Sequence, residues 1–131
     1  MGRRKTRTLT ELELEIMQVV WGKDEVTVEQ IQRELRERDR PLALPSIRTM
    51  LSILQQKGYV TRRRLSHAYH YRALVSADKA RKRILRDILD RAFDGSALDL
   101  VAALVKADMV SEEELEQISK LIGEHDRGAK K

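Results

Sequence analysis

The sequence has no cysteine, few aromatic residues and no long apolar run, and each absence narrows what the chain can be. Without cysteine there is no disulfide framework, no thiolate metal site and no cysteine nucleophile, as is usual in a reducing compartment. Aromatic residues make up 4% of the 131 positions, so a core must rest on Leu, Ile, Val and Ala. No stretch approaches the roughly 18 apolar residues of a membrane span. We therefore expect a soluble cytoplasmic protein, without membrane insertion, of one domain or two small ones.

Acidic residues are missing from one long window. The chain has 21 Asp and Glu, but none lies between Arg40 and Ser76, where there are seven Lys or Arg and two His. Residues 1–75 hold 15 Lys or Arg against 9 acids, whereas residues 76–131 hold 11 against 12. Because a localised basic field attracts polyanions and gains from counterion release, the N-terminal half is predicted to bind nucleic acid. The alternative is a solubility surface, but such surfaces usually intersperse both signs.

Two capping boxes mark the first helices. Thr10 opens "LTELELEIMQVVW" and Thr27 opens "VTVEQIQREL", each with a Glu or Gln three residues later. The pattern predicts helices over about 10–21 and 27–38.

A third helix and a hairpin fall inside the acid-free window. Pro45 suits a first helical turn and Gly58 a C-terminal stop, which predicts a helix over about 45–57. Beyond it, "YVTRRR" and "AYHYRAL" are rich in residues that favour strands, and they predict a two-stranded hairpin from about 59 to 73. Its link, "LSH", has no Gly or Asn, so the turn type stays open.

The remainder of the chain is predicted to be helical. Ser76 caps a helix that runs to about Phe93 with a broad apolar face, and Gly95 ends it. Ser96 and Ser111 each precede an acid three residues later and open two further helices. The whole pattern is three helices and a hairpin followed by three helices.

The third predicted helix has an outward face without a carboxylate. At 100° per residue, Ile47, Met50, Leu51 and Leu54 share the inward side. The opposite side and its flanks carry hydroxyls, an amide and a guanidinium, from Pro45, Ser46, Arg48, Thr49, Ser52 and Gln56. Arg can bond guanine bidentately, Gln can bond adenine, and Ser or Thr can bond either base or backbone. This face is therefore predicted to enter a DNA major groove.

The hairpin adds three consecutive arginines, Arg62, Arg63 and Arg64. Phosphate groups are their simplest partners, and the alternative for one or two of them is an ion pair with a glutamate of the first helix, Glu11, Glu13 or Glu15. Tyr69 and Tyr71 share one strand face and are predicted to be core residues rather than platforms for base stacking.

Two helices, a recognition helix and a hairpin form a winged helix-turn-helix, and three segments resemble one family with this order. "LTELELEIMQVVW", "PSIRTMLSILQQKGYV" and "AYHY" resemble the penicillinase-repressor family of winged-helix transcriptional repressors. The similarity extends over about residues 8–125. The matching residues are Glu13, Met17, Trp21, Ser46, Ile47, Thr49, Leu51, Leu54, Lys57, Gly58, Tyr69 and Tyr71.

The resemblance implies a homodimeric repressor of a palindromic double-stranded DNA operator. The expected fold is mainly α with a small β-hairpin wing, in which residues 1–75 form the winged helix-turn-helix and residues 76–131 form a three-helix dimerisation module. The DNA-binding residues would be Pro45, Ser46, Arg48, Thr49, Ser52, Gln56, Arg62, Arg63, Arg64 and His67. Apolar residues of the C-terminal helices would form the dimer, namely Ile84, Leu85, Ile88, Leu89, Leu100, Val101, Leu104, Leu115, Ile118, Leu121 and Ile122.

The resemblance also implies a route of induction. In resistance systems of the family, a membrane sensor protease triggers cleavage of the repressor in its dimer region, and by register the bond would join Ala103 to Leu104. Copper-responsive relatives use a C-terminal cysteine cluster, which this chain lacks. Many relatives carry Arg where this chain has Ile53, and a Gly-Arg wing turn where it has Ser66 and His67.

Two other classes of function are alternatives to DNA binding. An enzyme is disfavoured because the three histidines come without a metalloprotease motif, a phosphate loop or a nucleophile elbow, and neither a metal nor a cofactor is expected. A helical adaptor that binds another protein is the remaining alternative. DNA binding through several phosphates would weaken by orders of magnitude with added salt, whereas an apolar adaptor would hardly respond.

Overall fold

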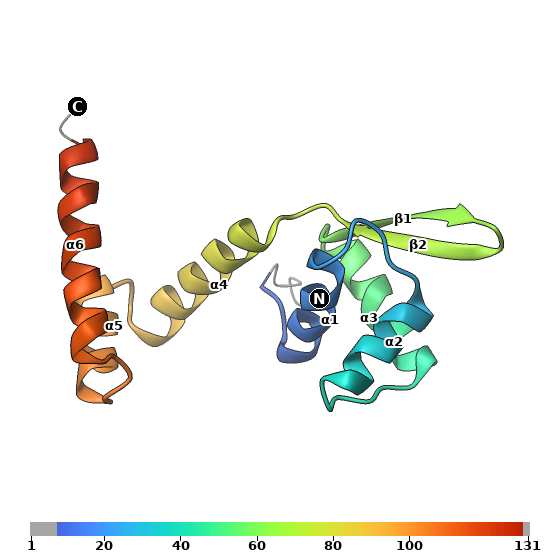
Figure 1. Cartoon of the computed structure of the whole chain (residues 1–131), viewed down its shortest axis with the longest axis horizontal. Helices are drawn as coiled ribbons and strands as arrows, with labels where there is room; N and C mark the ends of the chain where they lie inside the picture. Colours follow the sequence, from blue (N-terminus) through green and yellow to red (C-terminus); the bar gives the residue numbers. More distant parts are fainter. Residues whose placement is uncertain (1–7, 130–131) are drawn as a thin grey trace, which may run out of the picture. The chain divides into compact units, whose positions relative to one another are not determined.

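A computed structural model describes residues 8–129, which form six helices and one antiparallel hairpin (Figure 1). The elements are α1 (Glu11–Trp21), α2 (Val28–Glu37), α3 (Leu44–Gln56), β1 (Val60–Leu65), β2 (Ala68–Ala73), α4 (Ala77–Ala92), α5 (Ala97–Lys106) and α6 (Glu112–Ala129). The mainly α fold with a small hairpin is confirmed. Backbone contacts divide the chain into two compact units, one up to Asp87 and one from Ile88.

The predicted helix caps are present. The Thr10 hydroxyl accepts the Glu13 N–H at 3.3 Å while the Glu13 carboxylate accepts the Thr10 N–H at 2.9 Å, and Thr27 and Gln30 form the same box. Ser96 accepts the Asp99 N–H at 3.1 Å. These bonds satisfy backbone donors that a helix leaves without partners in its first turn, and so they fix where each helix begins.

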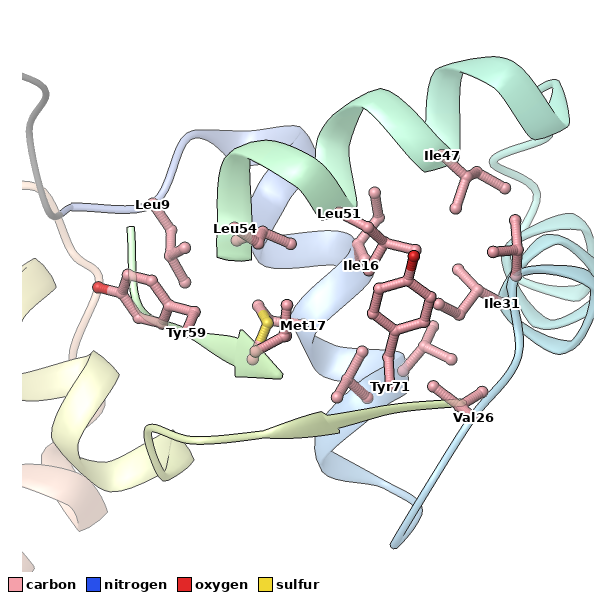
Figure 2. Packing of buried hydrophobic residues seen from close by; sticks show 14 of the residues in the cluster. Leu9, Ile16, Met17, Val26, Ile31, Ile47, Leu51, Leu54, Tyr59 and Tyr71 are labelled. Carbon is pink, nitrogen blue, oxygen red and sulfur yellow. The ribbon is translucent and has the colours of Figure 1, made fainter. Parts of the chain in front are cut away.

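One hydrophobic core lies in the first unit (Figure 2). Figure 2 shows Ile16 and Met17 of α1, Leu51 and Leu54 of α3 and Tyr71 of β2 pointing into the same cluster. The inward side predicted for α3 is confirmed, because its three apolar residues at helical spacing are fully buried and a fourth is partly buried, namely Ile47, Leu51, Leu54 and Met50.

The hairpin is closed by a turn of two residues, Ser66 and His67, between the paired residues Leu65 and Ala68. Their φ angles are 47° and 71°, and positive φ at both central residues identifies a type I′ turn, the turn type that the sequence left open. Two left-handed residues match the right-handed twist of the strands, although neither is glycine or asparagine.

Two long-range hydrogen-bonded contacts hold the hairpin and the segment after it. Val26 and Tyr71 exchange both backbone hydrogen bonds, at 2.9 and 2.8 Å, which adds an isolated bridge to β2. The Trp21 indole N–H donates to the Val75 carbonyl at 2.8 Å. Neither contact is predicted by the sequence pattern.

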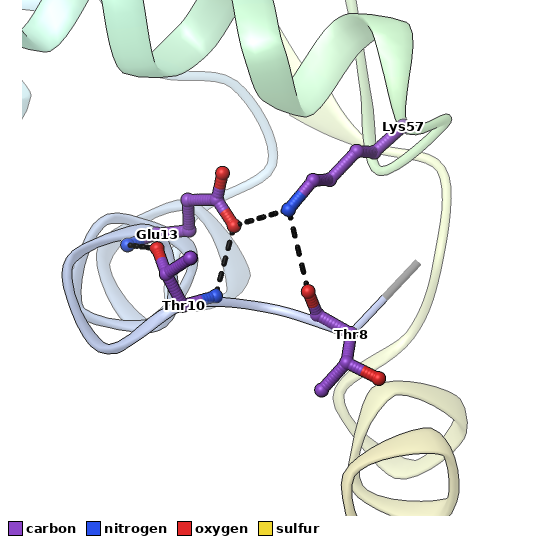
Figure 3. A network of polar contacts seen from close by, with 4 residues as sticks. All are labelled: Thr8, Thr10, Glu13 and Lys57. Carbon is purple, nitrogen blue, oxygen red and sulfur yellow. Dashed lines mark hydrogen bonds and ion pairs between the residues drawn. The ribbon is translucent and has the colours of Figure 1, made fainter. Parts of the chain in front are cut away.

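A buried ion pair joins the start of α1 to the end of α3 (Figure 3). The Lys57 ammonium lies 2.7 Å from the Glu13 carboxylate, and the two side chains are 7% and 3% exposed. Lys57 also donates to the Thr8 carbonyl at 3.3 Å, while the same Glu13 oxygen accepts the Thr10 N–H. Among the described residues, no buried side-chain nitrogen or oxygen lacks a hydrogen-bond partner, which is the condition for burying charges.

The second unit, unlike the first, has no buried core within its described part in the single chain. No described residue of α5 or α6 is buried. Large apolar side chains are instead exposed, for example Leu98 at 77%, Leu121 at 65% and Ile122 at 58%.

Candidate nucleic-acid interface

The outward face of α3 has the composition that the sequence predicts. Its six predicted DNA-binding residues, Pro45, Ser46, Arg48, Thr49, Ser52 and Gln56, are all exposed. Within residues 8–129, Arg48 forms no ion pair. The Thr49 hydroxyl donates to the Pro45 carbonyl at 3.0 Å, so its oxygen keeps acceptor capacity toward the outside of the helix.

The three wing arginines do not form a single patch. Register pairs Arg62 with Tyr71, Arg63 with His70, and Arg64 with Tyr69, so the strand alternation puts Arg63 on one face and its two neighbours on the other. All three are exposed, as is His67 in the turn. The structure thus brings four predicted residues to the hairpin but on different sides of it.

Arg63 has an intramolecular partner. Its guanidinium lies 2.6 Å from Glu25, a residue between α1 and α2, and a second bond to the other carboxylate oxygen measures 3.1 Å. The hydrogen bond from Arg63 holds the pKa of Glu25 below its ordinary value, and the charges of Arg63, His70 and Arg72 act in the same direction. Within residues 8–129 none of the three wing arginines forms an ion pair with a glutamate of helix one. Glu13 instead bonds Lys57, and Glu15 bonds Arg40 at 2.7 Å.

Arg62 and Arg64 share an aromatic neighbour. The Arg62 guanidinium lies 3.9 Å from the centroid of the Tyr69 ring, and that of Arg64 lies 5.8 Å from it. The core prediction is confirmed for Tyr71, which is 4% exposed, but it is wrong for Tyr69, which is 39% exposed. The reason is position: Tyr69 is nearer the turn, where the hairpin in Figure 1 extends beyond helices α1, α2 and α3.

Neither histidine of the hairpin lies in a metal cluster. His67 is in the turn, and His70 Nδ1 lies 3.9 Å from the Glu25 carboxylate. In the described part of the chain, no group of three or more His, Cys, Asp and Glu could hold a metal ion. Among residues 8–129, no helix combines the length and the apolar character needed to cross a membrane.

The residues predicted for dimerisation lie on α4, α5 and α6, and each is at least partly exposed in the single chain. Ala103 and Leu104, the predicted cleavage site, are partly buried within α5.

A three-helix core, an exposed polar third helix and a basic β-hairpin define a winged-helix protein. The family model described as penicillinase repressor matches residues 9–124, and the chain belongs to this family of transcriptional repressors. The methicillin resistance regulatory protein MecI of Mammaliicoccus sciuri is 23% identical over 118 residues, which cover 90% of this chain and 95% of that protein. The penicillinase repressor of Staphylococcus aureus is 21% identical over 112 residues, covering 86% and 88%.

The fold is also similar to a solved structure, that of the DNA-binding domain of the repressor BlaI. The TM-score is 0.50 at 22% identity, and the match covers 59% of this chain and 93% of that domain. This similarity supports the winged-helix fold, and the match to the family model confirms the family resemblance seen in the sequence.

Proposed function

We propose that the exposed face of α3 reads the bases of a palindromic operator in the major groove, and that the protein acts in the cytoplasm without catalysing a reaction. The observation that carries the proposal is a helix face with six exposed polar or proline residues and no carboxylate. Arg48 supports it most directly, because a guanidinium without a protein ion pair keeps its planar fork of donors available for guanine.

The wing supplies contacts to the phosphate backbone in this proposal. Arg64 is the strongest candidate, because it is exposed and forms no ion pair in the described residues. Arg63 would have to leave Glu25, or bind phosphate while still paired, so its contribution should be smaller. His67 lies at the tip of the turn and can meet the backbone or the minor groove.

We further propose that two copies associate through the second unit. Its helices bury none of their described residues, so alone they lack the core that an independent domain needs. An isologous contact between identical apolar surfaces would bury them and would present two α3 helices to the two halves of a palindrome. Leu121, 65% exposed, can be replaced without disturbing a monomer. Leu121→Asp should dissociate the dimer in sedimentation, while Ser119→Asp, which adds the same charge to α6, should not.

Release by a membrane sensor protease is a separate proposal. The bond between Ala103 and Leu104 lies inside helix α5, so cleavage would require this helix to unwind locally. If a membrane metalloprotease is encoded beside this gene, incubation with it should yield a fragment that ends at Ala103. An intact chain, or a cut elsewhere, would remove this proposal and leave DNA binding untouched.

The test of DNA binding compares operator and random duplexes. DNA selected from a random pool by the full chain serves as the operator, and fluorescence anisotropy gives both affinities. Arg48→Ala should weaken operator binding by about 1–3 kcal/mol and random binding by less. Arg36→Ala is the matched control, because it removes an exposed arginine of α2 that forms no ion pair within residues 8–129. Equal losses on both duplexes would contradict base reading by Arg48. If the unmodified chain bound no DNA even at low salt, the alternative of a helical adaptor that binds another protein would be favoured.

A further inference from the structure

We propose that Tyr69 is a positioning residue of the wing: its ring holds Arg62 and Arg64 together as a pair of guanidinium groups that bind a phosphodiester backbone. The inference rests on the proposed DNA binding. It assigns to Tyr69 a role that depends on the aromatic face and not on burial.

The first support is the geometry of the strand. Arg62 and Arg64 are two residues apart on β1 and point to the same face of the hairpin, where Tyr69 is paired directly with Arg64. Both guanidinium carbons lie within the roughly 6 Å at which a ring face attracts a cation, at 3.9 and 5.8 Å from the ring centroid.

The second support is that Arg62 and Arg64 have no carboxylate partner in the described residues. Arg63 on the opposite face is neutralised by Glu25 at 2.6 Å, whereas within residues 8–129 neither Arg62 nor Arg64 forms an ion pair. Arg62 donates to an uncharged oxygen, the Tyr71 hydroxyl, at 3.5 Å. Two like charges next to one ring leave a concentrated positive site, and an anion is its natural ligand.

The third support is that Tyr69 is not needed for the core. It is 39% exposed, whereas Tyr71 on the same face is 4% exposed and packs in the hydrophobic cluster. A stacked guanidinium still directs its in-plane N–H groups outward, so stacking can fix the side chain without consuming the donors that bind phosphate. The ring therefore reduces the side-chain freedom that binding would otherwise have to remove.

The experiment measures anisotropy of a labelled random-sequence duplex with the full chain over a series of salt concentrations, because phosphate contacts are independent of sequence. Tyr69→Leu removes the ring face, and Tyr69→Phe keeps it without the hydroxyl. We expect Tyr69→Leu to weaken binding by about three- to tenfold, the range given by one or two exposed cation–π contacts, and Tyr69→Phe to match the unmodified chain. Thermal melting should show both variants folded.

A second arm places Tyr69→Leu in a background with Arg62→Ala and Arg64→Ala. If the ring acts through these arginines, the leucine substitution adds no further loss there. A loss that persists would mean that the ring contacts DNA itself and would overturn the proposal. So would a Tyr69→Leu variant that binds like the unmodified chain, or a Tyr69→Phe variant as weak as Tyr69→Leu. Failure of the unmodified chain to bind any duplex would instead refute the proposed DNA binding.

Discussion

Replacing Lys57 with Met should destabilise the fold by about 3–5 kcal/mol, because it leaves the Glu13 carboxylate buried without its counter-charge. The two charged groups are 2.7 Å apart and almost fully enclosed. At an effective dielectric constant of about 20, their gross attraction is roughly 6 kcal/mol, which desolvation of both groups partly offsets. Methionine fills a similar volume, so a cavity adds little. The backbone N–H of Thr10 would remain as a donor to the carboxylate.

Urea denaturation of the full chain, followed by circular dichroism at one fixed protein concentration, measures the loss. Adding Glu13→Gln to Lys57→Met should recover a large part of the stability, because no charge is then buried and the amide oxygen can still accept the Thr10 N–H. Lys23→Met removes an exposed lysine and should change stability by no more than about 0.5 kcal/mol. A cost of less than about 1 kcal/mol for Lys57→Met, or a double variant no more stable than the single one, would contradict a buried charge as the cause.

Three further predictions concern backbone strain and one ion pair. Gly58→Ala should cost about 1–2 kcal/mol in the same urea assay, because φ is 83° there although a Cβ would meet no atom within 4 Å. Ser66→Asn combined with His67→Gly should raise the free energy of unfolding by about 1 kcal/mol, since Asn-Gly is the preferred pair for a type I′ turn. A lower melting temperature would contradict backbone strain at the positive φ angles of Ser66 and His67. Arg63→Gln should raise the pKa of Glu25 toward its ordinary 4.5 in an NMR titration. Because the pKa of Glu25 is lowered on folding, the pair stabilises above about pH 4.5 and is lost as pH falls through the folded-state value. An unchanged pKa of Glu25 in this variant would mean that Arg63 is not the cause of its lowered value.

The elements of the fold could be predicted because their signals are local. Thr10 and Thr27 each lie three residues from the side chain that completes the capping box, and Gly58 directly follows the helix that it ends. The composition of the α3 face was equally predictable, since a helix repeats every 3.6 residues and the printed sequence therefore tells which residues share a side.

The pairings within the candidate site could not be predicted in the same way. Arg63 and Glu25 are 38 positions apart, and Lys57 and Glu13 are 44 apart, so no local period relates them. Alternation on β1 does separate Arg63 from its neighbours, but it does not tell which face meets a carboxylate. The exposure of Tyr69 depends on how far the hairpin extends past the helices, which its strand pattern does not encode.

The ion pairs also change what the acid-free window means. It holds seven Lys and Arg, but Arg40, Lys57 and Arg63 bond carboxylates that lie elsewhere in the sequence. The four that remain are Arg48, Arg62, Arg64 and Arg72. Because Arg48 is assigned to base reading, two copies would offer six guanidinium groups from this window to phosphates, and the logarithm of affinity would fall against the logarithm of salt with a slope of about −5. A steeper measured slope would mean that one of the ion pairs opens on DNA, or that basic residues outside this window contribute, such as the four at positions 1–7. Glu25→Gln separates the two cases, because it frees Arg63 and steepens the slope only if that pair stays closed on DNA in the unmodified protein.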